Sequence, residues 1–137
     1  MVRRRDLLAY LIGAGVAGTL LTAPYAARLA AMRLIPGATT MANVPFFLLP
    51  ILWGVWNLLW ARHQPAMGIG AWGAILGVVA GVAVNVLFVA VGTWFPAVML
   101  LPAYLPVLYF LLFRLVIGPL NEALGVESER PAIAPMP

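Results

Sequence analysis

Residues 69–91, IGAWGAILGVVAGVAVNVLFVAV, contain neither a charged residue nor a proline. A helix needs about 20 consecutive apolar residues to cross the hydrocarbon core of a bilayer, and this run is long enough. A water-soluble fold would need a polar coat around such a segment. Only 9% of the residues are charged and 64% are hydrophobic, whereas soluble domains carry about 25% charged residues. The sequence therefore predicts an integral membrane protein.

Three further apolar runs accompany this one, and together they predict an all-α integral membrane protein with four transmembrane helices. The expected helices cover residues 7–27, 46–61, 69–91 and 97–117. They form a single four-helix transmembrane domain, residues 1–125. Residues 126–137 are rich in proline and are expected to be a disordered cytoplasmic tail.

The arginines indicate how the helices are oriented. The side of the two termini and of the second loop holds Arg3, Arg4, Arg5, Arg62, Arg114 and Arg130, and the other side holds Arg28 and Arg33. Cytoplasmic flanks carry the excess of basic residues, so both termini are expected in the cytoplasm, in a bacterial inner (plasma) membrane. The arginines lie dispersed at the ends of apolar runs, without interleaved aromatics, and no nucleic-acid partner is expected.

A second interpretation of the N-terminal segment stays open. RRRDLLAYLIGAGVAG resembles a twin-arginine export signal, with paired arginines before a moderately apolar stretch. Residues 22–27, TAPYAA, offer no clear cleavage site between small residues. A retained first helix is therefore favoured. Removal of the segment would leave three helices and place the termini on opposite sides of the membrane.

A series of small residues lies on one face of the third expected helix. Gly73, Gly77, Gly81 and Asn85 are four residues apart, so they share an arc of about 120°. Helices in a bilayer associate through close backbone contact, which small residues permit. We expect this face to be a helix-packing seam, with Asn85 either as a hydrogen-bonding clamp between helices or as a group that lines a pathway.

Two patterns indicate an internal repeat. Ala14, Gly18 and Thr22 repeat the four-residue spacing in the first helix and are expected to form a second packing seam. LLPILWGVWNLLWAR, residues 48–62, also aligns without gaps on LLPAYLPVLYFLLFR, residues 100–114. The chain then consists of two tandem helical hairpins. In each hairpin, a helix with small residues along one face is followed by a proline-containing helix that ends in arginine.

Side chains for catalysis are scarce. The sequence has no cysteine and one histidine, His63, and its one serine and one aspartate are Ser128 and Asp6. A catalytic triad would need Ser128 of the tail beside His63, and a metal site lacks ligands. We therefore expect no enzyme activity, no metal and no cofactor. The glutamate that small multidrug transporters carry in their first helix, and the polar break in the third helix of fluoride channels, are both missing.

Five residues are candidates for a pathway or a ligand site: Asn57, Asn85, Trp53, Arg62 and Arg114. The amides are polar groups within apolar helices, where an unpaired group is costly. Trp53 lies deep enough to pack against a neighbouring helix, and an aromatic ligand site is the alternative. The arginines either extend to lipid phosphate or jointly attract an anion.

Two functions remain after these exclusions. The first is a small polytopic protein that acts by helix association, as a homo-oligomer or as an accessory subunit of a larger membrane complex. Its expected partners are the lipid bilayer and either itself or other membrane proteins. The alternative is a small channel or facilitator formed by an oligomer, in which Asn57, Asn85 and the proline kinks line a pathway.

Overall fold

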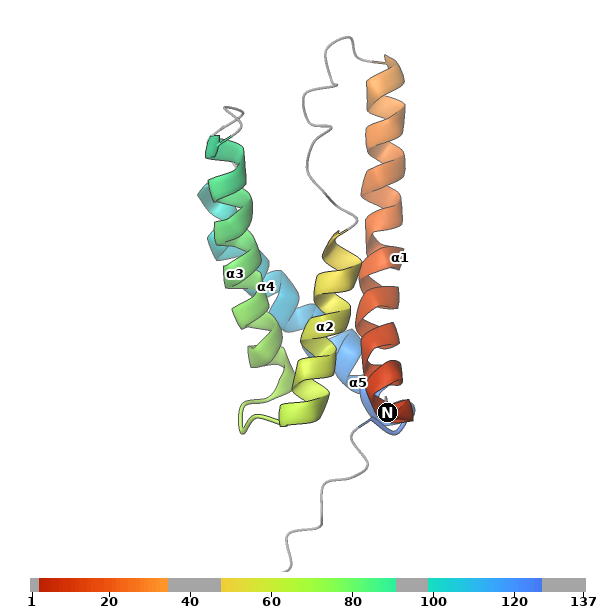
Figure 1. Cartoon of the computed structure of the whole chain (residues 1–137). Coiled ribbons are helices and arrows are strands. Elements are labelled where there is room, and N and C mark those ends of the chain that lie inside the picture. Colours follow the sequence, from red (N-terminus) through yellow and green to blue (C-terminus); the bar gives the residue numbers. More distant parts are fainter. Residues whose placement is uncertain (1–2, 35–47, 91–98, 127–137) are drawn as a thin grey trace, which may run out of the picture.

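The computed structural model describes residues 3–34, 48–90 and 99–126. These residues form helices and no strand, so the prediction of an all-α chain is confirmed for this part. The elements are α1 (Arg4–Leu34), α2 (Leu48–His63), α3 (Ile69–Ala90), α4 (Leu101–Leu112), the π-helix η3 (Phe113–Ile117) and α5 (Gly118–Ala123). The last three join into one rod, so the described residues make four helical rods that alternate in direction (Figure 1).

The ends of two helices differ from the expected bounds. The first helix begins three residues before residue 7 and continues past Pro24 to Leu34, a length of about 46 Å at 1.5 Å per residue. The last rod continues beyond residue 117 to Ala123. Val126 is completely buried, so the folded part includes the first residue of the expected tail. Residues 127–137 lie outside the described residues.

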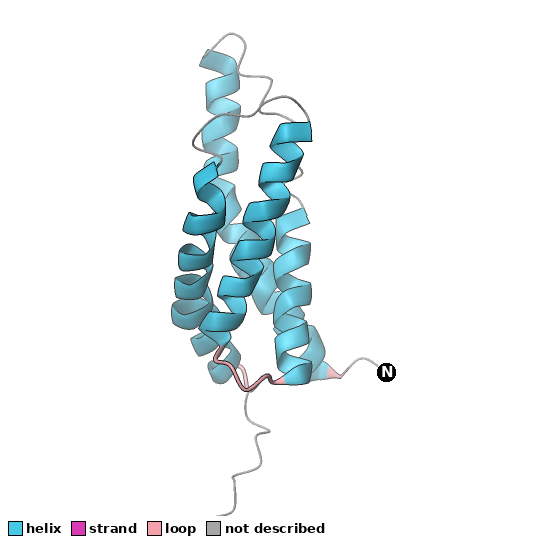
Figure 2. Ribbon diagram, turned by 90° about the vertical axis from the view of Figure 1, so that its left-hand side faces the viewer, coloured by secondary structure: helices cyan, strands magenta, loops and turns pink. Residues whose placement is uncertain are grey.

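The helices pair as two hairpins, α1 with α2 and α3 with α4. Direct contact between α2 and α3 is sparse by comparison. It includes Trp56 and Trp72, whose rings stack with centroids 4.8 Å apart. Each indole N–H donates to the backbone carbonyl of the other residue, at 2.9 and 3.1 Å. The start of α1 and the α2–α3 loop lie at the same end of the molecule (Figure 2).

The π-helix follows from Pro119. Proline has no N–H, and within an α-helix its ring would clash with the carbonyl four residues earlier. The wider π turn relieves this conflict, and the Gly118 N–H instead donates to the carbonyl oxygen of Phe113, five residues back. Phe113, Ile117 and Asn121, which are four residues apart, all lie on the buried side of the rod.

The last rod ends in a Schellman motif. Gly125 has a φ of 73°, which a residue without Cβ adopts freely. Its N–H donates to Glu122 O at 3.1 Å, and the Val126 N–H donates to Asn121 O at 2.8 Å. The motif turns the chain back so that the Val126 side chain is buried.

Two helices among the described residues are long and apolar enough to cross a membrane. They are Ile69–Ala90 and the rod Leu101–Ala123. Only 28% and 22% of their most apolar windows are buried inside the chain, so most of this apolar surface faces outward. The described part of α2 has 16 residues, fewer than the span of about 20 that a bilayer needs.

Candidate functional site

The glycines of α3 lie against the backbone of the last rod. A Cβ built on Gly77 would lie 2.6 Å from Leu105 O and 2.6 Å from Pro106 Cα. A Cβ on Gly81 would lie 2.7 Å from Pro102 Cα, and one on Gly73 would lie 2.5 Å from Phe113 Cγ. All three glycines are buried. The helices therefore approach too closely for any side chain, and the prolines of α4 form the opposite wall.

The corresponding contact of α1 differs from the predicted one. An added Cβ at Gly18 meets nothing within 4 Å, Thr22 is exposed and Ala14 is half-buried. The close approach to α2 is at Gly13, where a Cβ would lie 2.8 Å from Trp53 C. Ala9 and Ala17 are also buried, four residues to either side. The packed face of α1 is thus Ala9, Gly13 and Ala17.

The two hairpins have similar closest contacts. Gly13 contacts the backbone of Trp53 and Gly54, and Gly77 contacts that of Leu105 and Pro106. In the ungapped alignment of residues 48–62 on 100–114, Trp53 matches Leu105 and Gly54 matches Pro106. Each hairpin therefore crosses at the same point of its second helix.

A pair of amides joins the two hairpins. Asn57 of α2 and Asn121 of α5 are both completely buried. The Asn57 amide nitrogen donates to the Asn121 side-chain oxygen at 3.0 Å, and the Asn121 nitrogen donates to the Asn57 oxygen at 2.9 Å. The Asn57 nitrogen also donates to Ala9 O of α1 at 2.8 Å. Both amide hydrogens of Asn57 are thus engaged, which leaves this residue no donor for a pathway.

Asn121 did not figure among the predicted site residues. It lies 64 positions from Asn57, so no local pattern links the two residues. The available signal was its spacing, because Asn121 continues the series Phe113 and Ile117 at intervals of four. A lone amide in the register of two large apolar residues indicates a buried polar contact.

Asn85 has a different bonding pattern from the one expected of a clamp between helices. Its amide nitrogen donates to Gly81 O, one turn earlier in α3, at 3.2 Å. The side chain is half-buried. Among the described residues, the amide that joins helices is therefore the one at position 57.

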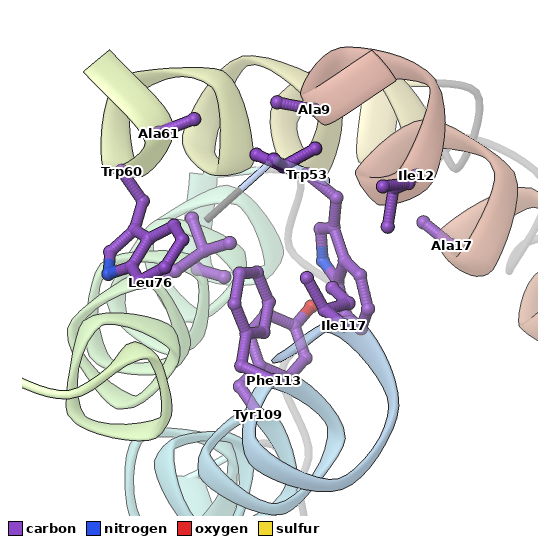
Figure 3. Packing of buried hydrophobic residues seen from close by; sticks show 12 residues of the cluster. Ala9, Ile12, Ala17, Trp53, Trp60, Ala61, Leu76, Tyr109, Phe113 and Ile117 are labelled. Atoms are coloured by element: carbon purple, nitrogen blue, oxygen red, sulfur yellow. The ribbon is translucent and has the colours of Figure 1, made fainter. Parts of the chain in front are cut away.

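Trp53 lies in an aromatic cluster between the hairpins (Figure 3). Its ring centroid is 4.7 Å from that of Tyr109, in an edge-to-face arrangement, and 5.3 Å from that of Phe113. Trp53, Tyr109 and Phe113 are all buried. Edge-to-face aromatic pairs contribute about 0.5–1.5 kcal/mol beyond burial of their area, so packing accounts for Trp53.

The two candidate arginines occupy different hairpins. Arg62 of α2 donates to the carboxylate of Asp6 in α1, with Nη2 2.8 Å and Nε 3.2 Å from Oδ2. Arg114 is exposed, and its guanidinium lies 5.8 Å from the ring centroid of Phe110 in its own rod. Each arginine thus has a separate partner.

The Asp6–Arg62 ion pair predicts a loss of stability in acid. The hydrogen bond from Arg62 lowers the pKa of Asp6 from its usual 3.8, and the charges of Arg62 and Arg3 lower it further. A depressed folded-state pKa stabilises the fold above the unfolded pKa, and this contribution is lost as the pH falls through the folded value. The wild-type unfolding midpoint in detergent should therefore fall as the pH drops below about 4, and Asp6→Asn should flatten this dependence.

Glu122→Gln is the matched control, because it removes an exposed carboxylate from the same end of the molecule. It should leave the acid dependence in place. Equal acid profiles for the wild type and Asp6→Asn would contradict the assignment to this ion pair.

Comparison of the chain with protein-family models, with curated proteins and with solved structures gave no match.

Proposed function

We propose that this chain is a four-span membrane protein that acts by helix association, as a homo-oligomer or as an accessory subunit of a larger membrane complex. The distribution of side chains supports membrane insertion. Large apolar residues are exposed along all four rods, while the closest contacts within each hairpin are made at glycine and the two buried asparagines join the hairpins. Val86 and Val89 of α3, for example, are 63% and 61% exposed. Water-soluble monomers rarely expose a continuous apolar surface of this extent.

Exposed polar groups of α1 are also satisfied without water. The Thr19 hydroxyl donates to Gly15 O at 2.9 Å, and the Thr22 hydroxyl donates to Gly18 O at 3.0 Å. A hydroxyl bonded within its own helix can face either lipid or another helix at little cost.

The observation that carries the association proposal is that α1 has small residues on two opposite faces. Ala9, Gly13 and Ala17 pack against α2, as described above. Gly15 and Thr19, with Gly18 and Thr22, form two overlapping Gly-x-x-x-Thr pairs centred about 180° away. A Cβ added to Gly15 or Gly18 meets nothing within 4 Å. Small residues four apart allow close approach of a second transmembrane helix.

We also propose that both termini lie on the cytoplasmic side of the membrane. Arg3 and Arg62 lie at the end of the molecule that holds the start of α1 and the α2–α3 loop, whereas Arg33 lies near the far end of α1 (Figure 1). This asymmetry supports a cytoplasmic location for the first end, in the inner membrane of a bacterium.

Gly18→Leu tests the proposal, because it fills the open face of α1 without a clash inside the chain. Native mass spectrometry and crosslinking from mild detergent should show the wild type as an oligomer or bound to another membrane protein. Gly18→Leu should weaken this association about tenfold or more, since loss of close packing costs at least about 1.4 kcal/mol. Val86→Leu, on an exposed face of α3, is the matched control and should associate like the wild type.

Two results would contradict the proposal. One is a wild-type chain that stays monomeric in detergent and in bilayers and brings no protein with it. The other is a Gly18→Leu variant with undiminished association. The unfolding midpoint of Gly18→Leu must match that of the wild type, so that a misfolded variant is not mistaken for one that has lost association.

A further inference from the structure

Basic side chains of α1 and α2 meet at one end of the first hairpin. Arg3, Arg4 and Arg5 occupy the start of α1, and Arg62 comes from the last turn of α2. The Arg5 Nη2 donates to Ala61 O at 2.7 Å, which holds this guanidinium across the two helices. The Asp6 carboxylate orients Arg62, as described above. The cluster is thus defined by contacts between two helices.

Positive charge is in excess in this cluster. The cluster contains four guanidinium groups and one carboxylate, that of Asp6, whose side chain is 13% exposed and already paired with Arg62. Arg3 and Arg4 are exposed, and the Arg62 side chain is 51% exposed. The exposed guanidiniums offer several N–H donors to an anion, and phosphate matches the geometry of arginine.

An exposed apolar track begins directly beside these arginines. Leu7 and Leu11 are 52% and 53% exposed. With Arg4 they follow spacings of three and four residues, so the three side chains share one face of α1. A ligand that fits this face has an anionic head and an apolar chain along Leu7 and Leu11, in the turns that precede the face within residues 15–22 that is proposed for helix association.

We infer that this face of α1 binds an anionic phospholipid, with the headgroup phosphate at Arg3 and Arg4 and an acyl chain along Leu7 and Leu11. The inference rests on the membrane insertion proposed above, and it adds a lipid class and a location. The positive-inside rule requires only that basic residues lie somewhere on the cytoplasmic flanks of the helices. This inference requires them at the first hairpin, because the charge excess and the apolar track coincide there.

The test is titration of the delipidated full chain in mild detergent with phosphatidylglycerol and, separately, with phosphatidylcholine of the same acyl chains. Native mass spectrometry counts the bound lipids. The wild type should bind phosphatidylglycerol about 25-fold more tightly, and Arg3→Gln with Arg4→Gln should reduce this preference to about twofold or less, since two basic residues near a lipid headgroup contribute about fivefold each. Arg33→Gln with Arg114→Gln removes two exposed arginines elsewhere and should keep the preference.

Two further experiments test whether the acyl chain contributes to binding and whether the bound phosphate must belong to a lipid. Leu7→Asn with Leu11→Asn should weaken binding of both lipids and leave their ratio unchanged. Inorganic phosphate at millimolar concentration should not displace phosphatidylglycerol, because it lacks the acyl chain. Competition by inorganic phosphate at concentrations equal to the lipid would show a simple anion site and would overturn the inference.

Failure of this inference is distinguishable from failure of the proposed function. A wild type that inserts into phosphatidylcholine bilayers but binds both lipids equally would overturn only the headgroup site, as would an unchanged preference in the Arg3→Gln, Arg4→Gln variant. A wild type that does not enter a bilayer of either lipid would overturn both proposals.

Discussion

Replacement of Gly77 by leucine should lower the free energy of unfolding by about 3 kcal/mol or more. A Cβ at this position would lie 2.6 Å from Leu105 O and 2.6 Å from Pro106 N. These are backbone atoms of α4, so no flexible side chain can move aside. The helices must separate along their whole contact, and Phe113 then loses its place against Gly73. Unfolding by sodium dodecyl sulfate, followed by circular dichroism and tryptophan fluorescence in mixed micelles, measures the change.

Gly15→Leu is the matched control for this prediction. It makes the same change in a helix, but at a site where an added Cβ meets nothing within 4 Å. In mixed micelles in which both proteins are monomeric, its stability should stay within about 1 kcal/mol of the wild type, which is the difference in helix propensity between glycine and leucine. If Gly77→Leu were as stable as Gly15→Leu, α3 and α4 would not be in contact along the glycines.

The helices and the face of α3 that packs against α4 were predictable from local pattern. A run of apolar residues without proline predicts one helix, and the structure forms α3 over Ile69–Ala90. Glycines at intervals of four define one face, and Gly73, Gly77 and Gly81 are buried there. Such a prediction succeeds because α3 has small residues concentrated on one side and β-branched residues on the other.

The packed face of α1 was not predictable in the same way. This helix has small residues on two faces, Ala9, Gly13 and Ala17 on one, and Gly15, Gly18 and Thr22 on the other. Spacing alone does not say which face meets α2. The choice follows from the partner, because the Asn57 amide bonds to Ala9 O and the Trp53 backbone lies against Gly13. Both contacts depend on residues 40 or more positions away.

The bounds of the last rod depend on a similar long-range effect. Pro119 predicts the end of an α-helix, since proline breaks the hydrogen-bond ladder. The π-helix at Phe113–Ile117 absorbs this break, and the rod continues to Ala123. The four-residue spacing of Phe113, Ile117 and Asn121 places them on one side of a helix, but Asn121 reaches Asn57 only because the rod continues past Pro119. The amide pair could therefore not be predicted from a helix expected to end at residue 117.

Asn121→Leu should destabilise the fold by about 1–3 kcal/mol, because it leaves buried donor and acceptor groups of Asn57 without partners. Asn57→Leu should have an effect of similar size, because it leaves the Asn121 amide without a partner and removes the hydrogen bond to Ala9 O. Both side chains are completely buried, so water cannot replace the lost bonds. Unfolding in mixed micelles, as for Gly77→Leu, measures each variant.

The double variant Asn57→Leu, Asn121→Leu separates hydrogen bonding from packing. Two leucines leave neither amide unpaired, so the double variant should be more stable than the sum of the single effects predicts, by about 1 kcal/mol. Asn85→Leu is the control, because its amide bonds only within α3 as far as the described residues show, and its effect should be about 0.5 kcal/mol or less. Strict additivity of the two single effects would mean that Asn57 and Asn121 act independently. The amide pair would then not couple the two hairpins, and the apolar and aromatic contacts around it would hold them together.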